Sequence, residues 1–426
     1  MTSPVGTKPL SAFLGAGEIE IRTGPFGTQL KASEYVDDGT PVINVRNIGF
    51  GSLRAEKLEY VPEKVASRLH QHCLRAGDIV FGRKGAVERH LLVREGQAGW
   101  IQGSDCIRVR VNSGPLNPHF LSYCLLLDEH KSWIQAQASH GATMATLNQS
   151  IIERIRVPER TASEQRRIAD VLSAYDDLIE VNQRRIAILE GMARRLFDEW
   201  FVRFRYPGHE AMSLVETELG MMPKGWCIVR AEEMIDFDPR TKVPKDGIKR
   251  FVPMGSLDTV SSVISGWETR SGNSGSKFQS GDTLFARITP CLENGKTGLV
   301  NFLDIGETAF GSTEFTVMRG KSVSSSFVYL LARSEAFRAI AIKSMGGADG
   351  RQRVRTEALK GYEFACPPTE LLSKFASVTD TLLRQVRVLA DQNDRLRAAR
   401  DLLLPKLISG EIDVSTAEET FAEAAE

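Results

Sequence analysis

The chain of 426 residues is poor in cysteine, and no two of its six cysteines form a CxxC pair. They are scattered as Cys73, Cys106, Cys124, Cys227, Cys291 and Cys366. This scatter argues against a disulfide framework and a cysteine zinc site, and it predicts reduced thiols. No apolar run approaches the roughly 18 residues of a membrane span. The start, MTSPVGTKPL, lacks the basic residues and apolar core of a signal peptide, so we expect a cytoplasmic protein without a membrane partner.

Catalytic signatures are also absent from the sequence. It contains no P-loop GxxxxGK[ST], no GxGxxG after a strand, no HExxH and no GxSxG elbow. The tetrapeptides NPPY and DPPY, with which amino-methyltransferases hold their target base, are missing too. Asp282, Glu293 and Lys296 lack the E-x-K spacing of a nuclease site and fit a solvated turn better. We therefore expect no catalytic residue, bound metal or cofactor in this chain.

Net charge is zero, because 54 basic residues balance 54 acidic ones. This balance excludes a uniformly basic protein that coats nucleic acid, but it leaves open a basic surface on one face. Hydrophobic residues make up 42% of the chain and charged residues 25%, which is ordinary for a globular protein. The length corresponds to about two to four domains, each with a core of its own.

The same order of predicted elements occurs twice along the chain. Strand-like segments precede a helical segment in each half: 41–48, 77–85 and 106–112 before 118–138, then 251–257, 281–289 and 314–320 before 325–344. Gly77-Asp78 and Gly281-Asp282 open equivalent strands at an offset of 204 residues, and Arg83 then corresponds to Arg287. We infer two homologous globular domains.

A long helix with a coiled-coil pattern follows each globular segment. The two helices should cover roughly 41 and 35 residues, or about 60 and 50 Å. Their predicted seam residues step by four and three: Ile168, Leu172, Tyr175, Ile179, Asn182, Ile186, Leu189, Ala193 and Leu196, then Phe375, Leu382, Val386, Leu389, Asn393, Leu396 and Leu403. Neither amphipathic helix buries its stripe alone, so we expect the two to pair.

We expect this pairing to be antiparallel, because a whole globular domain separates the two helices. Asn182 and Asn393 then either fix the register as buried amides or reach water at the edge of the seam. Pro405 is expected to break the second helix before the terminal LLPKLISG turn, which Gly410 ends.

The predicted fold is α+β, with two pseudo-repeated globular domains separated by two long antiparallel coiled-coil helices. The expected segments are a first domain at 1–158, a first helix at 159–206, a second domain at 207–367, a second helix at 368–414 and an acidic, disordered tail at 415–426.

Four stretches resemble the specificity subunit, S, of type I restriction-modification systems. They are TGPFGTQLKASEY…GTPVINVRNI (23–48), P…EQRRIADVLSAYDDLIEVNQRRI (158–186), GDTLFARITPCLENGKTG…GSTEFTVMR (281–319) and LLLPKLISGEIDV (402–414). The second helix departs from the pattern, because it begins TELLSKFAS and lacks the pair seen at Glu164-Gln165.

The resemblance implies two target-recognition domains, each reading one half of a split sequence in double-stranded DNA. It implies helices that dock two methyltransferase subunits, which methylate adenine with S-adenosylmethionine. When two restriction subunits join, the assembly uses ATP and Mg²⁺ to translocate and cleave unmethylated DNA. The cofactors belong to these partners, and the chain itself is expected to bind none.

Several side chains have the chemistry to contact DNA. Arg and Lys pair with guanine and Asn and Gln with adenine, whereas basic and hydroxyl groups hold phosphates. The candidates in the first domain are Arg46, Asn47, Arg83, Lys84, Thr143, Thr146 and Asn148. Those in the second are Arg287, Thr289, Lys296, Arg351, Gln352, Arg353 and Arg355, the last four within the glycine-rich loop 346–355. For each residue alone, the alternative is a solvated surface charge.

Two other classes of function compete with this hypothesis. One is a duplicated coiled-coil adaptor that binds proteins without DNA specificity, and the other is a stand-alone nuclease or methyltransferase. The missing catalytic motifs argue against the enzyme, and the basic, glycine-rich loops at equivalent positions of both halves argue against the adaptor. We therefore expect a DNA-specificity subunit that is not an enzyme on its own.

Overall fold

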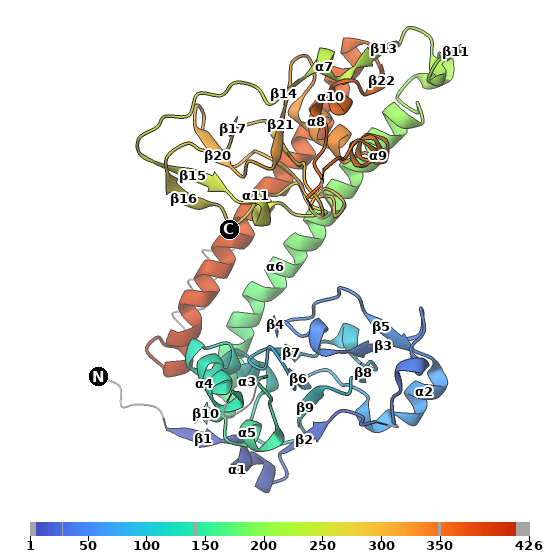
Figure 1. The fold of residues 1–426 in the computed structure, drawn as a ribbon. Coiled ribbons are helices and arrows are strands. Elements are labelled where there is room, and N and C mark those ends of the chain that lie inside the picture. Colours follow the sequence, from blue (N-terminus) through green and yellow to red (C-terminus); the bar gives the residue numbers. More distant parts are fainter. Residues whose placement is uncertain (1–5, 28, 140–143, 348–350, 415–426) are drawn as a thin grey trace. The chain divides into compact units, whose positions relative to one another are not determined.

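A computed structural model describes the chain except for residues 1–5, 28, 140–143, 348–350 and 415–426 (Figure 1). The predicted acidic tail at 415–426 thus lies outside the described residues. The chain forms two compact units: unit 1 comprises residues 1–179 and 395–426, and unit 2 comprises residues 180–394. The long helices α6 (Ala162–Phe197) and α11 (Thr369–Ser409) contribute to both units. Within the described residues, no helix is long and apolar enough to cross a membrane.

Unit 1 contains a five-stranded sheet of order β2-β9-β6-β7-β4 and a three-stranded sheet of order β5-β3-β8. β4 pairs in parallel with β7, and β8 with β3. A separate antiparallel pair, β1 with β10, joins the two ends of the domain. The strands are β1 (Thr7–Pro9), β2 (Ile19–Thr23), β3 (Thr40–Ile43), β4 (Phe50–Gly51), β5 (Glu59–Val61), β6 (Ile79–Gly82), β7 (His90–Leu92), β8 (Ile101–Gln102), β9 (Cys106–Val111) and β10 (Arg156–Pro158). The shorter helices are α1 (Leu10–Gly15), α2 (Glu63–Arg68), α3 (Pro118–Leu125), α4 (Asp128–Ala138) and α5 (Gln149–Glu153).

Unit 2 has two four-stranded sheets, of order β14-β21-β18-β19 and β16-β15-β20-β17. β13 pairs with β22, as β1 does with β10, and a hairpin of β11 and β12 precedes them. The strands are β11 (Leu214–Thr217), β12 (Gly220–Pro223), β13 (Cys227–Arg230), β14 (Ile235–Phe237), β15 (Ile248–Val252), β16 (Glu268–Ser271), β17 (Ser276–Gln279), β18 (Thr283–Ala286), β19 (Thr297–Leu299), β20 (Thr308–Gly311), β21 (Phe315–Gly320) and β22 (Glu363–Cys366). The shorter helices are α7 (Ala231–Met234), α8 (Ser325–Arg333), α9 (Glu335–Lys343) and α10 (Thr356–Lys360).

The two units share one topology. β6 lies between β9 and β7 in unit 1, and β18 lies between β21 and β19 in unit 2. Each central strand follows the Gly-Asp turn, where Gly77 and Gly281 have φ of 87° and 91°. Positive φ is a conformation that residues with a side chain rarely adopt, so both turns need glycine.

A buried ion pair stabilises each Gly-Asp turn. Arg110 Nε and Nη2 donate to the two oxygens of Asp78 at 2.7 and 2.6 Å. Arg319 Nε and Nη2 donate to those of Asp282 at 2.6 and 2.7 Å. The repeat therefore extends from the chain order to the same bidentate contact between equivalent strands.

Two predicted helices are each divided into two. The predicted segment 118–138 forms α3 and α4, because Leu127 adopts extended backbone between them. The predicted segment 325–344 forms α8 and α9, which Ser334 separates in the same way. The Ser334 hydroxyl also caps α9, accepting a hydrogen bond from Phe337 N at 3.4 Å.

The two long helices begin differently. Thr161 and Glu164 form a capping box before α6, in which Glu164 N donates to Thr161 Oγ1 at 3.2 Å and Thr161 N donates to Glu164 Oε2 at 2.8 Å. Gln165 is buried and accepts a hydrogen bond from Asn117 N at 2.9 Å, which fixes the start of α3. At the equivalent place in α11, Leu372 is buried in the apolar core. Apolar packing thus takes the place of the missing Glu-Gln pair.

α6 and α11 run antiparallel in each unit. The contacts pair Arg160 with Ile408 and Asp176 with Arg400 in unit 1, and Asn182 with Asn393 and Phe197 with Phe375 in unit 2. Residue numbers rise along α6 as they fall along α11, which only antiparallel helices produce. The predicted fold, α+β with two repeated domains and two long antiparallel helices, is confirmed.

The core of each unit takes side chains from both long helices. In unit 1 these are Ile168, Leu172, Tyr175 and Ile179 of α6 with Leu396, Leu403 and Leu407 of α11. In unit 2 they are Ala193 and Phe197 of α6 with Leu372, Phe375 and Leu383 of α11. Among the other predicted seam residues Val386 is buried, and those only partly buried are Ile186, Leu189, Leu196, Leu382 and Leu389.

Asn182 and Asn393 are buried, with 0% and 2% of their surface exposed. Asn182 Nδ2 donates to Asn393 Oδ1 and to Gln392 Oε1, both at 3.0 Å. The two amides therefore lie inside the seam and not at its edge. Another register of the helices would bury at least one amide without a partner, which costs free energy.

Pro405 does not break α11, and this expectation was wrong. The helix continues to Ser409 and ends at Gly410, where φ is 80°. Proline inside a helix costs about 3 kcal/mol. Burying a large apolar side chain contributes about 1.5–3 kcal/mol, and the last turns bury Leu403, Leu404, Leu407 and Ile408 in the core of unit 1. Packing therefore outweighs the local cost of the proline.

Substituting Asp282→Ala tests the buried pair of unit 2. The change leaves the Arg319 guanidinium without its carboxylate partner, so we expect unfolding in denaturant to show a loss of about 3–5 kcal/mol. Glu268→Ala removes a carboxylate from the exposed pair with Arg270 and is the control, expected to cost less than about 1 kcal/mol. Equal losses in the two variants would contradict a structural role for the Asp282 pair.

Candidate nucleic-acid interface

The predicted strand-turn and loop residues of unit 1 lie side by side. The turn after β6 receives the loop before α5, because Leu147 N donates to Arg83 O at 2.8 Å and Gly85 N donates to Ala145 O at 3.2 Å. On the other side Arg83 N donates to Asp105 O at 2.8 Å. These backbone bonds gather Arg83, Lys84 and Thr146 at the end of the sheet.

Unit 2 builds the same arrangement with other side chains. Val354 N donates to Arg287 O at 2.9 Å, and Thr289 N donates to Gln352 O at 3.1 Å. Arg287 N donates to Glu314 O at 3.0 Å, as Arg83 N does to Asp105 O. The equivalent surfaces thus share a backbone frame, while the side chains on it differ.

In unit 1, Arg83 and Lys84 both have close neighbours. The Arg83 guanidinium lies 5.1 Å from the ring centre of Phe26, a side chain that is 53% exposed. Lys84 Nζ lies 3.5 Å from Asp105 Oδ1, and both side chains are about half exposed. Exposed pairs of this kind are weak, so Lys84 can exchange Asp105 for a phosphate at little cost.

The candidate Asn47 does not fit a role in reading bases. It is fully buried on the 3-10 turn Val45–Asn47, where Nδ2 donates to Arg54 O and Glu56 O at 3.0 Å each, and Oδ1 accepts from Asn44 N at 3.1 Å. Its amide is used to close the turn, which the strand-like pattern of 41–48 did not reveal. Arg46 beside it is exposed and pairs with Glu59 at 2.5 Å.

The remaining candidates of unit 1 lie in the loop before α5. Asn148 caps α5, since its Oδ1 accepts from Ile151 N at 2.9 Å. Thr146 Oγ1 donates to Met144 O at 3.2 Å, and Met144 is 59% exposed. Thr143 lies outside the described residues.

In unit 2, Arg353 is held by an acidic side chain. Its Nε and Nη2 donate to Glu314 Oε1 at 3.1 and 2.6 Å, and Nε also donates to Oε2 at 2.9 Å. These hydrogen bonds, with the positive charges of Arg353 and Arg287, lower the pKa of Glu314 from its ordinary value. Glu314 therefore stays ionised and orients Arg353 on the surface.

The other candidates of unit 2 divide into exposed and partly buried groups. Arg351 and Arg355 are exposed, and Gln352 is half-buried. Lys296 donates to Met254 O at 3.1 Å, which ties its ammonium group to the backbone of its own unit. Thr289 is half-buried, and its hydroxyl, like the Arg287 Nε, is a buried polar atom without a hydrogen bond in the structure.

Sequence reasoning missed three residues of these surfaces. Asp105 and Glu314 occupy the same place in the two units and hold Lys84 and Arg353. Their position just before equivalent strands was a signal that the repeat could have shown. Phe26 stands in the quoted TGPFGTQL stretch, and an aromatic between proline and glycine was a second signal.

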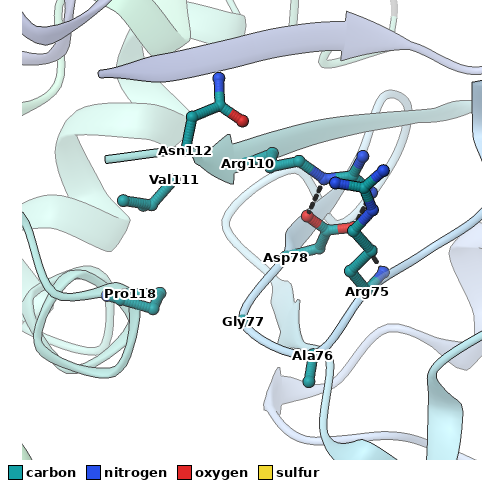
Figure 2. Close-up of a pocket in the computed structure, with 8 residues that line it drawn as sticks. All are labelled: Arg75, Ala76, Gly77, Asp78, Arg110, Val111, Asn112 and Pro118. Carbon is teal, nitrogen blue, oxygen red and sulfur yellow. Dashed lines mark hydrogen bonds and ion pairs between the residues drawn. The ribbon is translucent and has the colours of Figure 1, made fainter. Parts of the chain in front are cut away.

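A hollow of about 190 Å³ opens elsewhere in unit 1, beside the Gly-Asp turn (Figure 2). It is lined by Arg75, Ala76, Gly77, Asp78, Arg110, Val111, Asn112 and Pro118. Both oxygens of its one carboxylate, Asp78, accept hydrogen bonds from Arg110. The polar groups of this hollow therefore serve structural contacts. In the described part of the chain, no three His, Cys, Asp or Glu side chains gather as metal ligands would.

Comparison with known proteins gives a consistent set of similarities. Residues 30–190 match the family described as the type I restriction modification DNA specificity domain. The chain is 23% identical over 358 residues to the type I restriction enzyme MjaVIII specificity subunit of Methanocaldococcus jannaschii, covering 80% of this chain and 77% of that protein. It is 21% identical over 403 residues to the HindI specificity subunit of Haemophilus influenzae, covering 80% and 87%.

A solved structure also has this fold. The crystal structure of a type I restriction-modification S subunit from M. genitalium matches with a TM-score of 0.59 at 12% identity. The match covers 96% of this chain and 97% of that one.

The Glu314–Arg353 pair generates a prediction about pH. Since the pKa of Glu314 is lowered in the folded protein, the pair stabilises the fold above the ordinary pKa of a glutamate and loses this effect as pH falls through the lowered value. Glu314→Gln should therefore unfold at a lower denaturant concentration than the wild type at neutral pH. The difference should narrow as pH falls below the ordinary pKa of a glutamate. A difference that is constant with pH would contradict the ion pair.

Proposed function

The chain belongs to the type I restriction-modification specificity subunits, and from this premise we propose that it reads a split DNA sequence for a methyltransferase. Each unit would contact one half-site through its strand-turn and loop surface. The chain would carry no chemistry of its own, and methyl transfer would belong to its partners. One observation carries the proposal: the same backbone frame occurs twice, with different side chains on it.

The differences between the two surfaces support two different half-sites. Unit 1 presents Lys84 and an exposed Phe26 beside Arg83, whereas unit 2 presents Arg351 and the Glu314-held Arg353. Arginine forms bidentate pairs with guanine, and lysine contacts bases or phosphates as a point charge. Surfaces with different donors would select different bases.

The antiparallel helices support half-sites of opposite orientation on the duplex. A repeated protein that binds duplex DNA with approximate two-fold symmetry meets its half-sites in opposite directions. The bases between them would be uncontacted by either surface.

We further infer that the long helices dock two methyltransferase subunits, which use S-adenosylmethionine. Support comes from exposed apolar side chains on both helices: Val181, Ile188 and Met192 on α6, and Val378, Val388 and Leu402 on α11, each more than 40% exposed. Val181 and Val388 stand at equivalent places, 207 residues apart. Two restriction subunits, with ATP and Mg²⁺, would complete the cleaving assembly.

The alternative of a protein-binding adaptor is less well supported. It gives no reason for basic side chains to recur on the same backbone frame in both units. A stand-alone nuclease or methyltransferase would need catalytic motifs that the sequence lacks.

Sequencing that detects methylated adenine tests the proposal directly. Cells carrying this chain with its methyltransferase partner should show one split motif with two different half-sites and a spacer of unrestricted sequence. The partner alone, without this chain, is the control and should give no such motif. A continuous motif, or none, would contradict the proposed function.

Alanine variants of the two units should have separate effects. Arg351→Ala should weaken discrimination between bases in one half-site. If Lys84 contacts a base, Lys84→Ala should weaken discrimination only in the other half-site. If Lys84 contacts a phosphate, the variant should lower the affinity for all sequences and reduce the slope of log affinity against log salt concentration by about 1. A lost base contact should cost about 1–3 kcal/mol of discrimination. Binding to duplexes with single changes in each half-site measures this, and effects of Arg351→Ala on both half-sites would contradict separate reading.

A further inference from the structure

One lobe of unit 2 packs against the sheet β14-β21-β18-β19 through a separate hydrophobic cluster. The outer lobe comprises the sheet β16-β15-β20-β17 and the loop 257–267. In this cluster its side chains Val252, Leu257, Ile264 and Phe278 pack with Leu284, Phe315 and Val317 of β18 and β21. Among the described residues, this cluster contains no side chain of α6 or α11, whereas the main core of unit 2 contains several. The lobe therefore packs on β18 and β21, and its direct contacts with the long helices are of another kind.

A buried carboxylate of α6 holds the loop of this lobe. Glu190 is 3% exposed, and its Oε1 accepts from Ser262 N at 2.6 Å, Ser262 Oγ at 2.8 Å and Ser261 Oγ at 2.8 Å. One turn further along the helix, Arg194 Nη1 donates to Val260 O at 3.1 Å. Ser262 is fully buried, so its N–H and hydroxyl depend on Glu190.

A buried arginine of α11 holds the same loop. Arg387 is 6% exposed and donates from Nη1 to Ile264 O at 3.3 Å. Its guanidinium lies 5.7 Å from the ring centre of Trp267, and Asp391 of the same helix forms an ion pair with it. Trp267 stacks on Phe302 at 4.6 Å, which carries the contact into the lobe.

Backbone hydrogen bonds join the loop 257–267 to the candidate interface of unit 2. Leu299 N donates to Ser262 O at 2.9 Å, and Thr297 N donates to Asp258 O at 3.4 Å, so β19 is attached to it. β19 follows directly on the turn that begins at Arg287. Movement of the loop would move this turn, and with it the side chains that face DNA in the proposed function.

Unit 1 is held differently at the equivalent place. Its turn between the bridged residues Ile48 and Leu53 is two residues shorter than that between Leu257 and Ile264. In the described part of unit 1, Arg94 beside the core residue Val93 pairs with Asp177 of α6 at 3.0 Å, with side chains 34% and 61% exposed. Exposed pairs contribute little, while buried charge-assisted hydrogen bonds are about twice as strong as neutral ones.

We propose that Glu190 is a positioning residue for the second half-site, holding the outer lobe of unit 2 at a fixed angle to the helices together with Arg387. Hydrogen bonds require direction as well as distance, so this contact specifies an angle that apolar packing alone would leave looser. The distance at which the second half-site is accepted depends on it. This inference rests on the proposed function.

The test compares Glu190→Ala and Glu190→Gln in the complex of this chain with its methyltransferase partner. Glu180→Ala is the matched control, because Glu180 pairs with Arg184 on the surface of the same helix. Methyl transfer is measured on duplexes that hold both half-sites with the native spacer, or with one base pair more or fewer. Hydrogen exchange of loop 257–267 is measured on the same complexes.

In Glu190→Ala we expect the ratio of activity on altered spacers to activity on the native spacer to rise about tenfold, the equivalent of one lost charge-assisted hydrogen bond. Discrimination in the first half-site should stay unchanged. Glu190→Gln keeps an acceptor oxygen but loses the charge, so its ratio should lie between those of the wild type and Glu190→Ala. Glu180→Ala should match the wild type. Suppose that loop 257–267 loses its protection against hydrogen exchange in Glu190→Ala, but the ratio of activity on altered spacers to activity on the native spacer does not change. This result would overturn the inference while leaving the proposed function intact.

The other outcomes are also decisive. A wild-type complex that methylates no split motif would refute the proposed function. Faster hydrogen exchange of loop 257–267 in Glu190→Ala would then still show that Glu190 holds this loop. If Glu190→Ala does not fold, Ser262→Ala removes one donor to the same carboxylate and should raise the spacer ratio to a smaller degree. A folded Ser262→Ala with wild-type spacer ratio and protection would contradict the inference.

Discussion

The rest of the structure depends on the antiparallel pairing of α6 and α11, because neither unit completes its core without both helices. Unit 1 takes the first half of α6 and the last half of α11, and unit 2 takes the other halves. Each unit is therefore completed by part of the long helix that follows the other globular segment in the sequence. The buried amides of Asn182 and Asn393 disfavour other registers, so these shared cores form in one alignment.

On this scaffold the two repeats keep their backbone contacts and vary their surfaces. The Asp–Arg pairs at the Gly-Asp turns are the same in both units, and so are the backbone bonds of Arg83 and Arg287 to their neighbours. Side chains such as Lys84 and Arg351 stand on these frames without supporting them. Substitutions at such positions can thus change the surface of one unit with little cost to the fold.

Prediction from the sequence was strongest where a pattern extends over many residues. The long helices and the repeat each rest on such patterns, and both were predicted correctly. Local chemistry was harder: Asn47 has the right side chain for reading adenine, but a 3-10 turn buries its amide. Pro405 should end a helix by propensity, yet four buried apolar side chains outweigh it. Local propensity amounts to a few kcal/mol, and tertiary packing exceeds it.

The sequence by itself determined the duplication, the two amphipathic helices, the lack of catalytic motifs and the family resemblance, because each follows from residue type and spacing. Tertiary structure alone decided which charges are partnered. In the sequence Glu190 is an ordinary polar residue of α6. In the structure it is buried against Ser262, 72 residues away along the chain. Asp105 and Glu314 likewise acquire their roles only through Lys84 and Arg353. Burial and hydrogen bonding depend on which distant segments meet, and no local pattern records that.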